Sequence, residues 1–382
     1  MVLGGAGLHV DRTIGYARAH RRSPSTDVTP APASSDFEPG EEFAQPVLDP
    51  PCGGPGEPAC PPSDTVSGGA GGYIPVAAER VLDTRAAPAG AIGRGETRVV
   101  AIGGMGSVPP QDVQAVVLSI TASKSLGWSS LTVWPTGSLR PDATNLETQP
   151  GRPRRNLAIV PLGADGAVSV YNDRGHVEVV IDVLGWIAGA SEFQPVASQR
   201  LFDSGPTKAG KPAPIGPGRT VKVAVAGRAG VPVSGVGAVV LNVSSRTSTN
   251  VSDVTIWPTD AERPAEPSLV AQPSSRRDNV VVVAPGADVA VSVHNETGRT
   301  HLSIDVVGWF PTTSSYRALS PALLLDTNGG APLAAGSSVD ISVAGIGGVP
   351  ALDDDAKAEE ARSVVVNVIA TPLGQAPTTL TL

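Results

Sequence analysis

The sequence contains few aromatic residues and almost no cysteine. Aromatic side chains make up only 4% of the 382 residues, so a binding surface rich in Tyr or Trp is not expected. Both cysteines, Cys52 and Cys60, lie in a segment that is rich in Pro and Gly and contains no His. This arrangement does not match a zinc site. It predicts a local Cys52–Cys60 disulfide in an oxidising compartment, with two free thiols as the less favoured alternative.

Long apolar runs and an excess of positive charge are absent as well. No apolar run reaches the ~18 residues of a membrane-spanning helix. The net charge of −8 argues against a nucleic-acid partner, because phosphate backbones are bound by basic surfaces. At the N-terminus the apolar residues 1–10 precede the basic residues instead of following them, so no secretory signal peptide is recognised.

The motifs of common enzymes and metal sites are also missing. There is no Gly-x-Ser-x-Gly nucleophile motif, and the five His residues show no paired spacing that suits a metal. Gly-rich stretches precede strand-like runs rather than helices, which argues against a phosphate-binding loop. The sequence therefore predicts no catalytic residues, no metal and no cofactor. An enzyme of unrecognised type is the less favoured alternative, and it requires a cleft with perturbed titratable groups.

What the sequence does contain is a repeated block. Ile-Asp-Val-Leu-Gly-Trp at 181–186 returns as Ile-Asp-Val-Val-Gly-Trp at 304–309. An apolar run that holds one Asp and closes with Gly and an aromatic residue is typical of a strand in a packed sheet. Its return indicates that the chain is a tandem array.

Aligning the copies divides the chain into four parts. Residues 1–72 are predicted to be a disordered leader, because this Pro-, Gly- and Ser-rich segment has few aliphatic side chains to offset its ordering entropy. The first repeat covers 73–188, the second covers 193–311, and the third covers 316–382. The third copy stops before the closing block. We therefore expect it to be truncated and marginally stable, and the chain to be a fragment.

The full copies predict an all-β fold. Each contains short β-rich runs separated by Gly, Pro, Asn and Asp turns, with no run of helical period. This pattern predicts tandem antiparallel β-sandwich or jelly-roll-like domains, with a β-trefoil or closed barrel as the minority alternative. We expect each copy to bury its own core, and the copies to be separate units joined by short linkers near 189–192 and 312–315. The third copy offers one matching strand-like run, at 363–369.

The Asp residues that end the first apolar run of each copy are predicted to be structural. Asp83, Asp203 and Asp326 are each followed by Thr or Ser, a pattern typical of hydrogen bonds to the backbone of the next turn. Arg85 follows only in the first copy, so an acid with an Arg partner is not a shared feature of the repeats.

A second pair of carboxylates lies inside the closing block. Asp182 and Asp305 interrupt apolar runs, where a carboxylate must be paired or hydrogen-bonded. The candidate partners are Arg80 or Arg85 in the first copy and Arg200 in the second. A structural role is favoured over a binding or catalytic one.

The four repeated Trp residues are the large apolar anchors. Trp186 and Trp309 close the repeated block and are predicted to be structural. Trp134 and Trp257 each precede a Pro at the end of a strand-like run. Packing in the core or at the rim is favoured for them, and an exposed pair that stacks on a sugar ring is the alternative ligand-binding hypothesis.

The blocks of the repeats resemble those of a known group of bacterial proteins. They resemble the β-rich repeats of secreted and cell-surface actinobacterial proteins, which occur in tandem or are appended to cell-wall hydrolases. The shared blocks are Arg-Val-Leu-Asp-Thr-Arg at 80–85, Leu-Thr-Val-Trp-Pro at 131–135, Asn-Leu at 145–146, Gly-Val-Pro at 230–232, Ala-Val-Val-Leu-Asn-Val at 238–243 and the closing block. The resemblance covers roughly residues 73–382. It implies an extracytoplasmic, non-catalytic module, with no catalytic residue to transfer.

Two functions remain open from the sequence. The favoured hypothesis is a non-catalytic extracellular or cell-surface repeat protein that acts as a structural or adhesive module. The alternative is an accessory module of a cell-wall hydrolase that binds carbohydrate, with cell-wall polysaccharide or other surface proteins as partners. The chain differs from the resembling repeats in lacking a recognisable signal peptide, in losing Arg85 in two copies and in ending inside a copy.

Overall fold

The computed structural model describes residues 8–10, 72–86, 90–189, 192–205, 213–327, 330–351, 364–370 and 378–380. All of them belong to one compact unit. The described residues form strands and loops and no helix, so the all-β class predicted from the sequence is confirmed. Accordingly, no helix in the described ranges is long and apolar enough to cross a membrane. The predicted Cys52–Cys60 disulfide lies outside the described residues.

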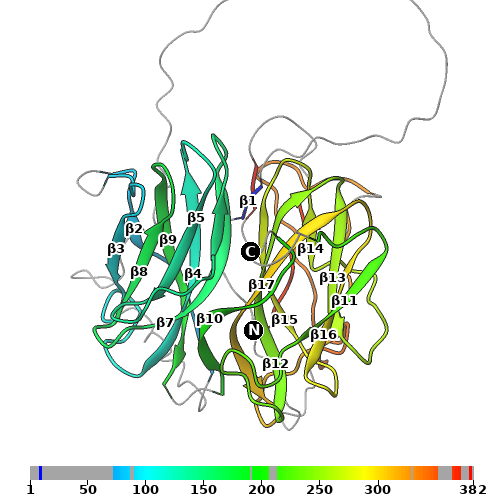
Figure 1. Cartoon of the computed structure of the whole chain (residues 1–382). Coiled ribbons are helices and arrows are strands. Elements are labelled where there is room, and N and C mark those ends of the chain that lie inside the picture. Colours follow the sequence, from blue (N-terminus) through cyan, green and yellow to red (C-terminus); the bar gives the residue numbers. More distant parts are fainter. Residues whose placement is uncertain are drawn as a thin grey trace, which may run out of the picture. The chain divides into compact units, whose positions relative to one another are not determined.

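The first full copy forms a sandwich of two antiparallel four-stranded sheets (Figure 1). One sheet has the order β2 (Tyr73–Asp83), β9 (Glu178–Ala188), β4 (Val113–Ser123) and β7 (Arg154–Pro161). The other has the order β3 (Thr97–Ala101), β8 (Ala167–Asn172), β5 (Ser129–Pro135) and β6 (Leu146–Thr148).

The second copy repeats this topology strand for strand. Its first sheet has the order β10 (Gln194–Asp203), β17 (Thr300–Pro311), β12 (Val236–Ser248) and β15 (Arg277–Val283). Its second sheet has the order β11 (Arg219–Ala224), β16 (Ala290–Asn295), β13 (Ser252–Pro258) and β14 (Leu269–Ala271). The closing block of each copy therefore lies in β9 and β17, between the first strand of the copy and its most apolar strand.

Each sandwich buries an aliphatic core between its two sheets. In the first copy Leu118 and Ile120 of β4 meet Leu131 of β5 and Val168 of β8, and all four are fully buried. Burying one such side chain contributes about 1.5–3 kcal/mol. Because aromatic residues are scarce, the core depends on many Val, Ile and Leu contacts.

A bulge in the closing strand sends its apolar residues to both faces. Along β4, Val117 pairs with Gly185 and Leu118 pairs with Val183, so Leu184 is the extra residue on β9. Val183 thus faces the sandwich core, whereas Leu184 packs in a second apolar cluster on the opposite face. The corresponding bulge in β17 places Val307 in that same second cluster.

The glycine of the closing block makes room for an aromatic ring. A Cβ on Gly185 would overlap the ring of Tyr73, and a Cβ on Gly308 would overlap the ring of Phe193. The Tyr73 hydroxyl donates a hydrogen bond to the carbonyl oxygen of Leu184 at 2.7 Å, and burial raises its pKa. The block therefore requires Gly because an aromatic side chain at the start of each copy, Tyr73 or Phe193, lies over it.

The two sandwiches are not separate units. The second apolar cluster joins Val117, Leu184 and Ile187 of the first copy to Val240 and Val307 of the second, and all five side chains are buried. The expectation of independent copies on short linkers is therefore wrong. The physical reason is that β4 and β9 are apolar on both faces, and the outward face must also be removed from water.

The third copy is organised differently from the two full copies. Residues 316–327, 330–351 and 364–370 contain no assigned strand, so the strand predicted at 363–369 is not formed in its described part. Further along, β18 (Thr378–Leu380) pairs antiparallel with β1 (Leu8–Val10). Residues 8–10 thus form a strand within the segment predicted to be a disordered leader, and residues 11–71 lie outside the described residues.

Candidate ligand-binding site

The predicted structural carboxylates of the first copy share one arginine. Nε of Arg80 donates to Oδ1 of Asp182 at 2.8 Å, and Nη1 of Arg80 donates to Oδ2 of Asp83 at 3.2 Å. Arg85 adds a backbone hydrogen bond and two side-chain hydrogen bonds to Asp83, the shortest at 2.6 Å. The hydrogen bond from the Arg85 guanidinium is the main cause that holds the pKa of Asp83 well below its usual range.

The second copy builds the same bridge in a more buried setting. Arg200 donates from Nε to Oδ1 of Asp305 and from Nη1 to Oδ2 of Asp203, both at 2.5 Å. The Asp305 side chain is only 1% exposed, compared with 12% for Asp182. Burial raises the pKa of Asp305, and the ion pair with Arg200 opposes that rise.

The hydroxyl residue after each of these carboxylates bonds to the closing strand. Oγ1 of Thr84 accepts a hydrogen bond from the Val179 amide at 2.7 Å, and Oγ of Ser204 accepts one from the Leu302 amide at 2.7 Å. Both clusters therefore link the first strand of a copy to its last strand. The third copy has Leu323 at the position of Arg80, and its Asp326 is exposed and outside any strand.

The rings proposed to stack on sugar are buried. Trp134 is 7% exposed and Trp257 is 8% exposed. Their indole N–H groups donate to the backbone carbonyls of Ser138 and Ala261, both at 3.0 Å. This burial fits packing in the core or at the rim, and ligand binding at these two rings stays a prediction.

The Trp residues of the closing block have a packing role. Trp186 packs against the core of the first sandwich and Trp309 against the core of the second. Both are half-buried. They lie at equivalent places in β9 and β17, so each ring covers the equivalent part of its own core.

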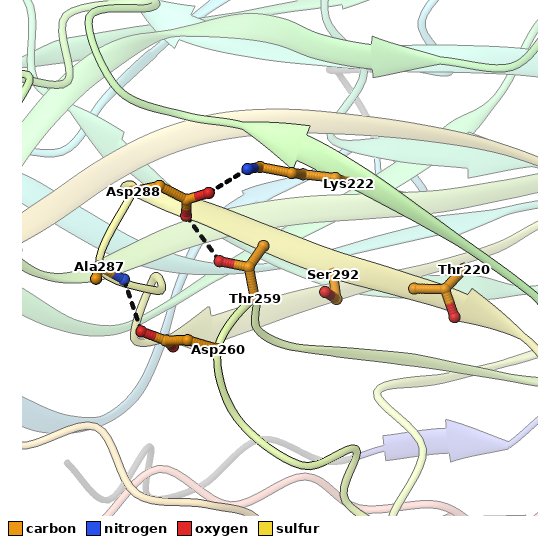
Figure 2. Close-up of a pocket in the computed structure, with 7 residues that line it drawn as sticks. All are labelled: Thr220, Lys222, Thr259, Asp260, Ala287, Asp288 and Ser292. Atoms are coloured by element: carbon orange, nitrogen blue, oxygen red, sulfur yellow. Dashed lines mark hydrogen bonds and ion pairs between the residues drawn. The ribbon is translucent and has the colours of Figure 1, made fainter.

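An open groove lies on the second sheet of the second sandwich. It has a volume of about 510 Å³ and is lined by Thr220, Lys222, Thr259, Asp260, Ala287, Asp288 and Ser292. Figure 2 shows that these residues come from strands β11 and β16 and from the two turns beside them. All of the functional groups in the lining are hydroxyl, carboxylate or ammonium groups, with no aromatic ring.

An ion pair and two hydrogen bonds hold the carboxylates at one end of the groove. Lys222 forms an ion pair with Asp288, and the Thr259 hydroxyl donates to the same carboxylate at 2.7 Å (Figure 2). The Lys222 contact, followed by the Thr259 hydrogen bond, lowers the pKa of Asp288. Asp260 accepts a hydrogen bond from the Ala287 amide at 2.9 Å. Both carboxylates are therefore held in place at the mouth of the groove.

A polar network continues the groove along the same sheet. The hydroxyl of Thr220 lies 2.9 Å from Nδ1 of His294, whose Nε2 lies 3.2 Å from Oε2 of Glu296. Arg263 donates to that same oxygen at 2.6 Å, and this hydrogen bond is the main cause that lowers the pKa of Glu296. The side chains on this face can thus accept and donate hydrogen bonds to a ligand rich in hydroxyl groups.

The lining of the groove differs from the equivalent residues of the first copy at two positions. Register places Val99 of β3 opposite Ser169, as Lys222 of β11 is opposite Ser292. The first copy therefore has an exposed Val99 where the second has Lys222. Likewise, Gly137 occupies the place of Asp260. The groove is not among the sites predicted from the sequence, although these two differences between otherwise similar copies are a signal that the sequence contains.

Within the described ranges, no three His, Cys, Asp or Glu side chains come together to hold a metal ion. In the groove itself, Asp288 is paired with Lys222 and Thr259, and Asp260 accepts one hydrogen bond from the Ala287 amide. A carboxylate has about four acceptor sites, so both can accept further hydrogen bonds from a ligand.

The described residues form two tandem β-sandwiches, and the second of them carries the polar groove. No family model matches the chain, and no curated protein sequence matches it. Among solved structures the chain is similar to the N-terminal CBM22-1-CBM22-2 tandem domain of Xyn10C from Paenibacillus barcinonensis, at 9% identity and a TM-score of 0.19. That match covers 62% of this chain and 98% of the other. At this TM-score the similarity carries no argument about function.

Proposed function

We propose that the chain is a non-catalytic extracellular or cell-surface module whose two sandwiches act as one rigid structural unit. The observation that supports this function is the buried apolar cluster shared by β4, β9, β12 and β17. A shared core of this kind opposes bending between the copies, because bending would expose apolar surface to water. The location rests on the resemblance to secreted and cell-surface repeats.

Buried polar contacts at the same boundary fix how the sandwiches meet. The carboxylate of Glu147 in the first copy pairs with Arg276 and Arg246 of the second. Its backbone amide donates to Oδ2 of Asp278 at 3.0 Å, and the Ser244 hydroxyl donates to Oδ1 of that Asp at 2.5 Å. Since a buried polar group that loses its partner costs about 1–3 kcal/mol, sliding of one sheet over the other is disfavoured.

The rigidity can be measured with paired spin labels. Labels at Leu126→Cys in the first copy and Val233→Cys in the second, in a chain whose native Cys52 and Cys60 are replaced by Ser, report the distance between sandwiches. Both label sites are exposed, at 76% and 73%. We expect a single narrow distance distribution, and a broad one in the matched variant Val240→Asp, which places a charge in the shared cluster. A broad distribution in the unsubstituted chain would contradict the proposal.

Carbohydrate binding is the second candidate function, and the polar groove is the observation that favours it. A sugar presents adjacent hydroxyl groups, and these match the hydroxyls of Thr220, Thr259 and Ser292 together with the carboxylate of Asp260. This version of the hypothesis places the ligand on the sheet of the second copy and not at Trp134 or Trp257.

The test gives the second copy the two residues by which the first copy differs along the groove. The double variant Lys222→Val/Asp260→Gly has the groove residues of the first copy, so we expect it to lose retention in gels that contain soluble cell-wall polysaccharide. Lys124→Val removes a charge from an exposed Lys outside the groove, whose partner is Glu178, and should leave retention unchanged. Equal retention of all three proteins would exclude the groove as the binding site. No retention of the unsubstituted chain on any polysaccharide would exclude the function.

A further inference from the structure

The same hydrogen-bond arrangement occurs at both boundaries between successive copies. At the first boundary Nδ2 of Asn156 donates to Oδ1 of Asn242 at 3.0 Å, and Nδ2 of Asn242 donates to the carbonyl oxygen of Thr144 at 2.5 Å. The contact joins the first copy to the central strand β12 of the second copy.

At the second boundary the equivalent atoms repeat the arrangement. Nδ2 of Asn279 donates to Oδ1 of Asn367 at 3.1 Å, and Nδ2 of Asn367 donates to the carbonyl oxygen of Pro267 at 3.1 Å. Here the incoming residue belongs to the described segment 364–370 of the third copy, which forms no strand of its own. The contact is therefore made even where the incoming copy lacks the sandwich fold.

Each contact has a receiving side and an incoming side. The receiving pair is an Asn side chain and a nearby backbone carbonyl, namely Asn156 with Thr144 or Asn279 with Pro267. The receiving Asn is oriented within its own copy, because Asn156 also donates to the Asn145 carbonyl at 2.7 Å and Asn279 to the Ser268 carbonyl at 2.8 Å. The incoming residue, which we call the docking asparagine, is Asn242 or Asn367.

The chemistry of the contact selects asparagine. The docking side chain must accept one hydrogen bond and donate another in a different direction, which a primary amide does with its separate oxygen and nitrogen. The first copy has Ser119 at this position, opposite Asp182 on β9 just as Asn242 is opposite Asp305 on β17. Oγ of Ser119 is buried and has no hydrogen-bond partner among the described residues. The first copy thus carries the receiving pair without a docking asparagine.

We propose that the docking asparagine and the receiving pair form a one-directional docking surface between successive copies of the repeat. The partner that fits a receiving pair is a further copy with Asn at the position of Asn242. This inference rests on the proposed structural function and names the contact that sets its repeat-to-repeat geometry.

Contacts between the segments that connect the copies also join each copy to the next one along the chain. Oγ of Ser315 donates to the Glu192 carboxylate at 2.7 Å, which joins the second connecting segment to the first. The rings of Phe310 and Tyr316 stack at 4.5 Å between centroids, and Phe310 also contacts Phe193 at 5.1 Å. An incoming copy is therefore held at its start by aromatic packing and within its central run by the docking asparagine.

Two pairs of spin labels in the full chain test the inference. The pair Leu126→Cys and Val233→Cys reports on the first boundary, and the pair Val251→Cys and Val365→Cys reports on the second. We expect Asn242→Ser to increase the undocked population only at the first boundary, and Asn367→Ser to do so only at the second. Loss of these hydrogen bonds corresponds to a rise of roughly 5- to 30-fold in that population.

A control variant and a double variant complete the test. Asn250→Ser replaces an exposed Asn that bonds to its neighbour Thr249, and it should leave both distance distributions unchanged. Asn279→Ser should match Asn367→Ser, and the double variant should add little, because the two residues act through one contact. Narrow distributions in Asn242→Ser and Asn367→Ser would overturn the docking surface while leaving the rigid unit intact. Broad distributions in the chain with native asparagines would overturn the structural function itself.

Discussion

Nε of Arg200 lies 2.5 Å from Oδ1 of Asp305, and this ion pair links the first strand of the second sandwich to its closing strand. The equivalent pair in the first sandwich, Arg80 and Asp182, has the same geometry at 2.8 Å but a more exposed arginine. The Arg200 side chain is 22% exposed, against 49% for Arg80. The two copies thus share the same Arg–Asp ion pair, and it is more buried in the second copy.

Removing the arginine should therefore cost more in the second copy. Arg200→Met leaves the Asp305 carboxylate buried without its main partner, and we expect a loss of about 3–5 kcal/mol in the free energy of unfolding. Arg80→Met should cost less, because solvent reaches that pair. Urea unfolding of both variants measures the difference, and equal losses would show that burial does not set the strength of the pair.

The boundary between the sandwiches should weaken as the pH rises. Burial, followed by repulsion from Glu147, raises the pKa of Asp278 from its ordinary value of 3.8 to about 7. The folded chain therefore keeps this proton in a pH range where the unfolded chain has lost it. The contribution of Asp278 to stability is greatest below pH 4, falls as the pH increases from about 4 to 7, and is constant above that range.

Asp278→Asn isolates this effect. The amide cannot ionise, so the fall in stability between about pH 4 and 7 should be smaller in the variant than in the unsubstituted chain. Thermal unfolding at a series of pH values measures it. Parallel stability curves for the two proteins would rule out Asp278 as the titrating group.

A methyl group on the closing glycine should disrupt the second sandwich. In Gly308→Ala the new Cβ overlaps the ring of Phe193, and overpacking of this kind typically costs about 1–3 kcal/mol. The double variant Gly308→Ala/Phe193→Leu removes the ring and should recover part of the loss. Chemical denaturation of the single and double variants compares them, and no recovery would place the strain elsewhere.

The buried Trp residues should matter for stability. Trp257→Ala deletes a ring that is 8% exposed together with its hydrogen bond to the Ala261 carbonyl, so we expect a loss of about 3–5 kcal/mol. Trp128→Ala removes a ring that is 38% exposed and that contacts the Arg276 guanidinium, so it should cost less. Near-native stability of Trp257→Ala would contradict the packing role.

The repeats made the class of fold predictable. Strand-like runs such as Val-Val-Leu-Asn-Val at 239–243, separated by turn residues, indicated antiparallel sandwiches before any contact was known. The carboxylates of Asp182 and Asp305 indicated ion pairs for the same reason, since a charge within an apolar run needs a partner. Of the candidate partners Arg80, Arg85 and Arg200, the structure places Arg80 against Asp182 and Arg200 against Asp305.

The candidate groove was harder to see in the sequence. Lys222 and Asp260 look like ordinary solvated residues, because their convergence depends on the order of β11, β16 and β13 in the sheet. The docking contact could not be predicted from the sequence for a similar reason. Asn156 and Asn242 belong to different copies, and no local pattern shows that their side chains meet.

The sequence by itself determined the all-β class, the tandem order of the copies and the glycine-aromatic closing block, because strand alternation and turn chemistry act between near neighbours. Only the tertiary structure decided that the two full copies share a buried cluster. An apolar residue such as Val117 has the same appearance in a sequence whether it faces its own core or another sheet. The tertiary structure also decided that Trp134 and Trp257 are buried, since exposure depends on the strands and loops that close over a ring.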